Sequence, residues 1–418
     1  MTRRRWLAIL ALATALAVPA AGAADGKSTL LPSFDLYDAW TDNFLLAPDH
    51  SHLPRVTAWS TSFQPGLRYR YDSFRTESWI SVAADFLHVW NLRGYDGWPE
   101  SVLGDIEWAY WASPSTRVTF GEQLTYYTDP RNQPFSSGRV IETLRTESIN
   151  NRLFGQIAYM PDPLGRLDAA YAYVTTEFRD PTLWDTVDHQ VTTLWTQQIA
   201  PSQKLMIFYN FNRVLFSHNY DFIRHFIDPH YKMVPGFPVA LHNAYDFDTH
   251  TPGLGFQYLA TPTWTVEMRS GVIVPCVEKG RLYEDPHLEW YERIDVTKLF
   301  WKMQLALSYN RDYAPAYGLA GAFVTQTVGG HLDERWSLKV ETVQDLYYTN
   351  YSQPGTNLDT LTATVGATYY FYTWIGLGGS YNFTEQLGGP DGSRQRTTAD
   401  LAQVRLSLGV PRPDWIRF

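Results

Sequence analysis

The residues that could do chemistry are charged side chains spread over segments in which polar and apolar residues alternate. Carboxylates beside basic groups could perform general acid–base catalysis, or the same side chains could face water inside a hollow structure. We favour the second interpretation. The candidates are Asp85, Glu107, Glu267, Arg269, Arg293, Asp295, Lys302, Lys339, Glu341 and Arg405.

Sequence motifs of common enzyme and metal sites are absent or incomplete. The patterns G-x-S-x-G, H-E-x-x-H and C-x-x-C-H do not occur. Gly26, Lys27 and Ser28 match the end of a P-loop, but Ala21 stands where that motif needs a glycine. We therefore predict no catalysis, no cofactor and no metal. Four histidines are further candidates for metal ligands, but their spacing fits no ligand pattern: His218, His225, His230 and His242.

The first residues predict export from the cytoplasm. Arg3 to Arg5 precede an apolar run from Trp6 to Val18, and small residues end at Ala23, as in a secretory signal peptide. We expect a signal peptide at 1–23 and a single domain at 24–418. Removing three arginines changes the net charge from -9 to -9 - 3 = -12, which disfavours nucleic acid as a partner. With one cysteine, Cys276, the chain can form no internal disulfide.

Strict alternation of apolar and polar residues is the main structural signal. In the hairpin at 359–385, Leu361 and Val365 alternate with Thr362 and Thr364. No later window offers 18 consecutive apolar residues, so the chain is not expected to cross a membrane as helices. Aromatic residues make up 16% of the chain and gather at predicted strand ends. The pattern predicts an all-β fold, a transmembrane antiparallel β-barrel with apolar side chains toward lipid and polar ones toward the lumen.

Predicted connections alternate in length, as they do between the two sides of an outer-membrane barrel. Short turns are expected on the periplasmic side and long loops outside. The segments between them number about 18, and uncertain boundaries leave 16 to 20 strands open. Within this barrel we expect the lumen to be lined by Glu267, Arg269, Arg293, Asp295, Lys302, Gln304, Lys339, Glu341 and Arg405.

The predicted loop from Ser217 to Phe247 is rich in aromatic residues and histidines. A loop of this length in a compact protein often has a function. It could constrict the pore, form a cap or contact sugar rings, or its aromatic residues could pack on neighbouring loops. The candidate contact residues are Tyr220, Phe222, Phe226, Tyr231 and Phe237.

One early segment resembles a known group of proteins. PSFDLYDAWTDNFLLAPDHSH, followed by FQPGLRYRY, is similar to outer-membrane barrels found with bacterial exopolysaccharide systems, over residues 32–71. The resemblance implies an outer-membrane exit for a polysaccharide that works with a periplasmic polysaccharide export protein. Thr41, Asp42 and Asn43 are expected to shape the first hairpin and not to touch substrate.

Together these observations predict an exopolysaccharide channel in the bacterial outer membrane. Its expected partners are the polysaccharide, the periplasmic export protein, the barrel assembly machinery and the lipid bilayer. One alternative is a general or solute-specific diffusion porin. Another is a plugged barrel that acts as a scaffold or adhesin.

Overall fold

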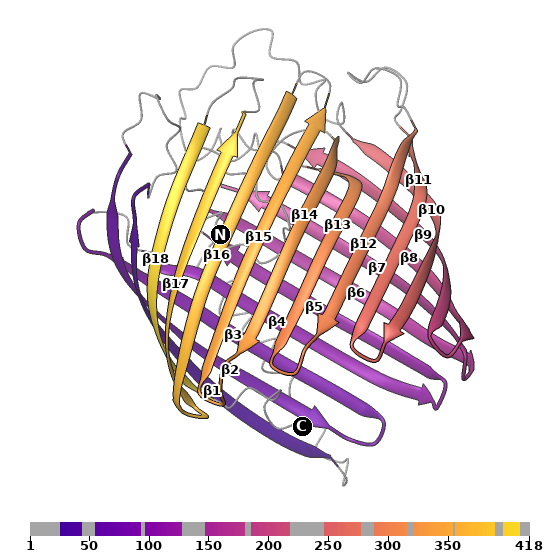
Figure 1. Ribbon diagram of the computed structural model, residues 1–418, viewed down its shortest axis with the longest axis horizontal. Coiled ribbons are helices and arrows are strands. Elements are labelled where there is room, and N and C mark those ends of the chain that lie inside the picture. The colour runs from indigo at the N-terminus through magenta and orange to yellow at the C-terminus, as the bar shows by residue number, and fades with distance from the viewer. Residues whose placement is uncertain are drawn as a thin grey trace.

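A computed structural model describes residues 26–43, 55–92, 97–127, 147–179, 185–217, 246–276, 288–315, 322–353, 356–388 and 396–409. Its described part consists of eighteen strands joined by turns and loops (Figure 1). The strands are β1 (Lys27–Thr41), β2 (Ala58–Asp72), β3 (Thr76–Val89), β4 (Gly97–Ser113), β5 (Thr116–Tyr127), β6 (Ser148–Asp162), β7 (Gly165–Phe178), β8 (Asp185–Ala200), β9 (Gln203–Ser217), β10 (Phe247–Thr261), β11 (Trp264–Cys276), β12 (Glu289–Leu299), β13 (Met303–Pro315), β14 (Ala322–Arg335), β15 (Val340–Gln353), β16 (Thr356–Tyr372), β17 (Ile375–Leu387) and β18 (Arg396–Gly409).

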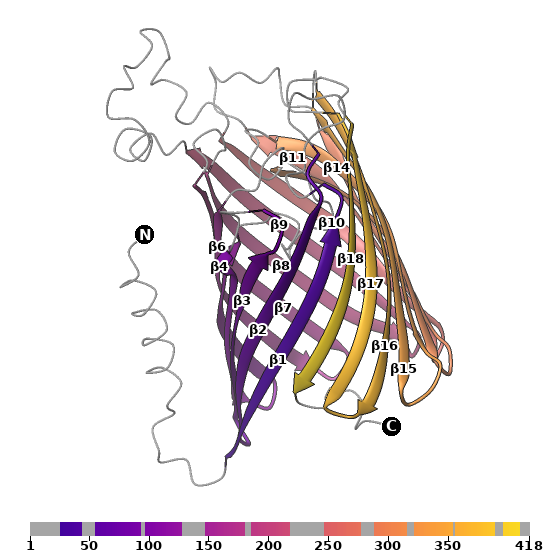
Figure 2. The ribbon, with the colours of Figure 1, turned by 90° about the vertical axis from the view of Figure 1, so that its left-hand side faces the viewer.

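Each strand pairs antiparallel with the next one in the chain, and β1 also pairs with β18 (Figure 2). The ring is therefore a closed up-and-down barrel. Closure leaves no unpaired sheet edge, so backbone N–H and C=O groups are satisfied within the wall. The prediction of a closed all-β barrel with 18 strands is confirmed. Among the described residues, no helix is long and apolar enough to cross a membrane.

The two ends of the barrel differ in their connections. At the turn end, β2 and β3 are joined by 73–75, β8 and β9 by 201–202, and β16 and β17 by 373–374. At the loop end the intervals are longer, for example 128–147 between β5 and β6. One loop-end connection is short, because β15 continues to Gln353 and β16 begins at Thr356.

Alternation along each strand sorts side chains onto the two faces of the wall, because neighbouring residues point to opposite sides. On β16 the outward Val365 is 57% exposed, whereas the inward Thr364 accepts a hydrogen bond from Asn382 Nδ2 at 2.8 Å. Buried side chains such as Val214, Phe216 and Leu358 lie on the inward face. The predicted outward placement of Leu361, Val365, Leu305 and Leu408 agrees with this register.

Candidate functional site

Four charged residues on two neighbouring strands form a compact cluster on the lumen wall. Glu267 and Arg269 lie on β11, and Arg293 and Asp295 lie on β12. In the register, Glu267 is directly opposite Asp295, and Arg269 is directly opposite Arg293. Residues two apart on a strand share a face, so all four side chains point into the lumen. We call these residues the charged quartet.

Ion pairs within each strand stabilise the charged quartet. Arg269 NH2 lies 2.7 Å from Glu267 Oε1, and Arg293 Nε lies 2.6 Å from Asp295 Oδ2. Two arginines directly opposite each other would repel, and the adjacent carboxylates offset that repulsion. Arg269 Nε is buried and makes no hydrogen bond. The quartet can therefore bind an anionic group with its guanidiniums or a cationic group with its carboxylates.

An apolar and aromatic patch lies next to the charged quartet, toward the loop end. Phe208, Ile273 and Tyr291 are buried together on the inward face, and the rings of Phe208 and Tyr291 are 5.2 Å apart. Gly253 leaves room for this patch, because a Cβ there would lie 2.2 Å from the Phe208 ring. Leu194 also packs on the cluster. Phe208, Ile273 and Tyr291 are at most 6% exposed, so the patch packs beside the quartet without presenting an open apolar surface.

Three other predicted lumen residues also lie on inward faces. Gln304 is on β13 opposite Asp333, and Arg405 on β18 is opposite Tyr37. Arg405 binds Asp35 through Nε at 3.1 Å and NH2 at 2.9 Å. Glu341 on β15 is 3% exposed.

Lys302 and Lys339 lie in turns and not on the strand walls. β13 begins only at Met303 and β15 only at Val340. Lys302 Nζ lies 5.2 Å from the Trp301 ring centre and donates a hydrogen bond to Trp336 O at 3.4 Å. Apolar alternation includes Trp301, so the sequence alone does not mark that the strand begins only at Met303. Both lysines therefore stand at the rim of the turn end.

The predicted constriction residues Tyr220, Phe222, Phe226, Tyr231 and Phe237 lie outside the described residues, as do the four loop histidines. Cys276 ends β11 and is exposed. The described residues contain no group of three or more His, Cys, Asp or Glu side chains that could hold a metal ion.

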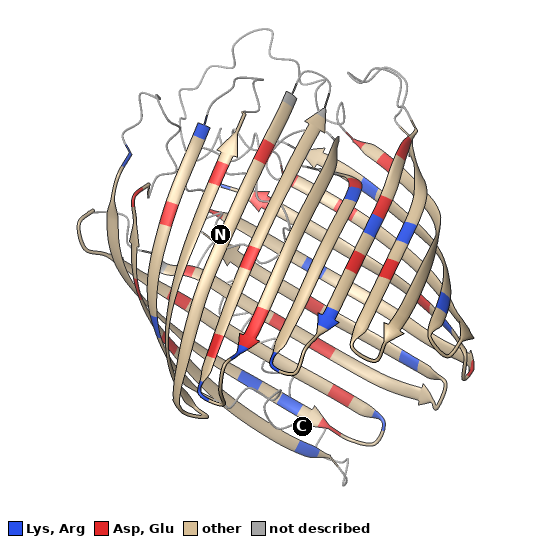
Figure 3. Cartoon of the chain, in the orientation of Figure 1, with Lys and Arg blue, Asp and Glu red and all other residues tan. Residues whose placement is uncertain are grey.

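Several inward charges were missed by the sequence reasoning. Both signs occur along strands around the barrel (Figure 3). Arg68 lies over the Trp79 ring, and Arg152 NH1 donates a hydrogen bond to Gln123 Oε1 at 3.3 Å. Alternation within β2 and β6 could have identified them. Inward acids outnumber inward bases on the register. The acids are Asp35, Asp72, Glu77, Asp85, Asp105, Glu107, Asp168, Asp188, Glu267, Glu289, Asp295, Asp312, Asp333, Glu341 and Asp345, and the bases are Lys27, Arg68, Arg70, Arg117, Arg152, Arg166, Lys204, Arg269, Arg293, Arg335 and Arg405.

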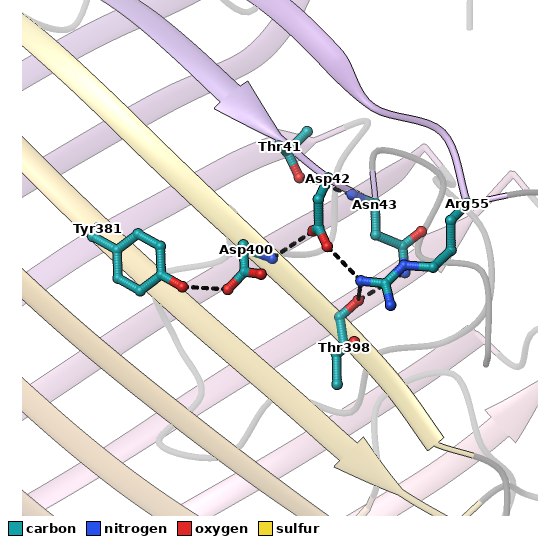
Figure 4. Close-up of polar contacts among 7 residues, drawn as sticks. All are labelled: Thr41, Asp42, Asn43, Arg55, Tyr381, Thr398 and Asp400. Atoms are coloured by element: carbon teal, nitrogen blue, oxygen red, sulfur yellow. Dashed lines mark hydrogen bonds and ion pairs between the residues drawn. The ribbon is translucent and has the colours of Figure 1, made fainter.

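A second group of polar contacts joins the first strand to the last (Figure 4). Asp42 Oδ1 accepts a hydrogen bond from Asp400 N at 2.8 Å, and Asp42 also binds Arg55. Asn43 is fully buried, and its Nδ2 donates to Thr398 O at 2.8 Å. The expected role of Thr41 to Asn43 in the first hairpin is therefore incomplete. The seam between β1 and β18 is held by a group of residues that we call the closure lock: Thr41, Asp42, Asn43, Arg55, Thr398 and Asp400.

Comparisons with known proteins give a likeness of fold only. No family model matches the chain, and no curated protein matches it. Among solved structures, Pseudomonas aeruginosa OccK2 (OpdF) aligns with a TM-score of 0.47 and 8% identity, covering 92% of this chain and 98% of that one. P. aeruginosa OpdQ gives 0.45 and 8%, with the same coverage. The P. aeruginosa siderophore receptor PirA gives 0.43 and 8%, covering 91% of this chain and 80% of that one. At this level of similarity, function must be argued from the chain itself.

Proposed function

We propose that the chain is an outer-membrane channel through which small polar solutes diffuse. The observation that carries the proposal is the closed 18-strand ring with apolar side chains outside and charged or hydroxyl side chains inside. A barrel of 16 to 18 strands encloses an aqueous channel, whereas smaller barrels are filled by their own side chains. Only helices and closed barrels satisfy their backbone in lipid.

Aromatic side chains at both ends support a bilayer as the surroundings. At the turn end Trp301, Trp336 and Trp374 are exposed. At the loop end, the outward Trp59 and Trp290 are likewise exposed. Trp and Tyr are enriched where a membrane meets water, because one part of each ring prefers lipid and the other water. The apolar wall between these bands is the surface that lipid would cover.

The resemblance to exopolysaccharide barrels gives little support to polymer export. Thr41, Asp42 and Asn43 of the resembling segment contribute to the closure lock. They hold the barrel together, and this role requires no contact with a substrate. Small-solute passage and polymer export also predict different behaviour in cells. Deleting the gene should reduce uptake of particular small solutes while surface polysaccharide stays normal. Loss of surface polymer with unchanged uptake would instead favour export.

Reconstitution tests the channel directly. Purified full-length protein in planar bilayers should give stepwise conductance, and liposomes containing it should admit monosaccharides faster than larger oligosaccharides. The excess of inward carboxylates predicts a modest preference for cations. Absence of conductance from correctly folded protein would contradict the proposal and favour a plugged barrel.

Charge changes in the charged quartet should shift ion selectivity in opposite directions. The double variant Arg269→Gln/Arg293→Gln should raise the cation-to-anion permeability ratio by roughly twofold, because two positive charges leave the lumen wall. Glu267→Gln/Asp295→Gln is the matched control and should lower the ratio. Reversal potentials in a salt gradient measure both. Unchanged selectivity in both variants would place the conducting path away from this wall.

A further inference from the structure

We propose that the turn end of the outer wall, around Lys298, binds the headgroup of an anionic phospholipid. The site lies on the outward face of β11 and β12 and on the turn that joins β12 to β13. The inference rests on the membrane location proposed above. It goes beyond passage of solutes through the barrel, because it assigns a ligand to a surface outside the channel.

Lys298 lies on the outward face of the wall, one residue before the end of β12. In the register it is directly opposite Trp264, the first residue of β11, and Leu305 on β13. Trp264 is 38% exposed, and Leu305 is one of the outward residues described above. Lys298 is therefore turned away from the lumen, at the height where lipid headgroups meet a barrel.

Two aromatic rings and one hydroxyl group position the Lys298 ammonium. Its Nζ atom lies 5.0 Å from the centre of the Trp264 ring and 5.4 Å from that of the Phe300 ring. It donates a hydrogen bond to Thr263 Oγ1 at 3.1 Å. A lysine ammonium has three donors, and among the described residues the other two have no acceptor and no carboxylate partner. They can therefore bind an anion.

Lys302 adds a second positive charge at the neighbouring turn. Its Nζ atom lies 5.2 Å from the centre of the Trp301 ring and donates to Trp336 O at 3.4 Å. The outward carboxylate beside this turn is Glu334, which accepts a hydrogen bond from Thr342 Oγ1 at 3.3 Å. One carboxylate offsets the two lysines only in part. We call Lys298, Lys302 and the rings that contact them the basic rim.

Outward arginines near the loop end differ from the basic rim, because they have carboxylate partners within the chain. Arg396 Nε lies 2.8 Å from Glu385 Oε1, and Arg213 Nε lies 3.7 Å from Asp248 Oδ1. Within the described residues, the two lysines of the basic rim form no such ion pair. A bound ligand can therefore supply the negative charge that the chain does not.

Exposed tryptophans favour a lipid over a soluble anion. Trp301 is 93% exposed, and Trp336 and Trp374 on the next two turns are 62% and 53% exposed. Tryptophan prefers the boundary between lipid and water. The turns at 114–115 and 201–202, in contrast, consist of proline and serine. The sector that carries the basic rim is therefore suited to the headgroup layer of a bilayer.

A phosphodiester headgroup matches the donors of the basic rim. Its two non-bridging oxygens can accept hydrogen bonds from the ammonium of Lys298. The acyl chains would lie against the apolar wall above, where Met268 and Leu307 are each 48% exposed. A lipid with net negative charge is favoured over a zwitterionic one, because the ammonium of a zwitterionic headgroup offsets its own phosphate.

Lipid titration of the purified full-length protein tests the site. Native mass spectrometry measures the binding of phosphatidylglycerol and of phosphatidylcholine with the same acyl chains. We expect phosphatidylglycerol to bind about tenfold more tightly, because each lysine near a membrane surface favours anionic lipid. Lys298→Gln/Lys302→Gln should make the two affinities nearly equal. Equal affinities in the unmodified protein, or an unchanged preference in the double variant, would overturn the proposal.

Lys27→Gln/Lys204→Gln is the matched control. It removes the same charge at the same end of the barrel, but Lys27 and Lys204 face the lumen, opposite Asp72 and Gln257. The preference for phosphatidylglycerol should therefore persist. Its loss in this control would assign the preference to the overall charge of the protein and overturn the site. Heat-dependent gel mobility checks that both variants are folded.

A soluble competitor separates a lipid from a free phosphate. Glycerol phosphate has the phosphate of the headgroup without acyl chains, so it should displace far less bound lipid than the same concentration of phosphatidylglycerol. Equal displacement would overturn the lipid as the ligand. These readouts need no conductance. A protein that prefers anionic lipid but does not conduct would contradict only the channel, and one that conducts without this preference would contradict only the lipid site.

Discussion

Replacing Val365 with arginine should prevent most of the protein from inserting into a bilayer, whereas arginine at Thr364 should be tolerated. Val365 faces outward and is 57% exposed. It lies at mid-height, because the row of directly paired residues that contains it runs from Trp40 at the loop end to Trp264 at the turn end. An arginine facing lipid near the midplane costs about 2–4 kcal/mol. At residue 364 the same side chain would point into lumen water, where only the hydrogen bond from Asn382 is lost.

Folding from urea into preformed vesicles measures this difference. The folded fraction is read from gel mobility without heating, across a urea series, for the unmodified protein and both variants. We expect the midpoint of Val365→Arg to move to much lower urea and that of Thr364→Arg to stay near the original. Equal loss in both variants would contradict the assignment of faces and hence the membrane barrel.

Removing the Asp42 carboxylate should weaken closure of the barrel. Asp42→Ala leaves the Asp400 N–H without this acceptor and removes the ion pair with Arg55, which keeps its hydrogen bond to Thr398 O. A buried donor left unpaired costs about 1–3 kcal/mol, and the part-buried Asp400 N–H should fall at the lower end of this range. The Arg55 ion pair adds little because Arg55 is 39% exposed. The free energy of unfolding should therefore fall by about 1–3 kcal/mol, measured by urea titration in vesicles.

Asp359→Ala is the matched control for the closure lock. Asp359 accepts hydrogen bonds from Tyr348 OH and Asn350 Nδ2, but it joins β15 and β16, which are consecutive in the chain. Strands β1 and β18 meet only after the whole ring has formed, so losing contacts at their seam should slow the final folding step more. If Asp359→Ala slowed that step as much as Asp42→Ala, the special role of the closure lock would be wrong.

Local patterns in the sequence were sufficient for the class of fold and the face of many residues. Period-two alternation at Leu361, Val365 and their neighbours predicts a strand with one apolar side, because adjacent residues point in opposite directions whatever the strand pairs with. Counting such segments and the breaks between them gave eighteen strands. The inward direction of Glu267, Arg269, Arg293 and Asp295 followed from the same alternation.

Only the tertiary structure decided which of these side chains meet. The position of Arg269 directly opposite Arg293 depends on strand register, and a shift of one residue would turn one of them outward. Lys302 and Lys339 lie in turns and not on the lumen wall, because alternation alone does not mark the residues at which a hairpin turns. The outward direction of Glu122 on β5 depends likewise on its pairing with Ile106 and Leu153. Asp42 and Asp400 are 358 residues apart, and their contact exists only because the ring closes. Alternation is a property of neighbouring residues, whereas register and closure are set by pairing between distant strands.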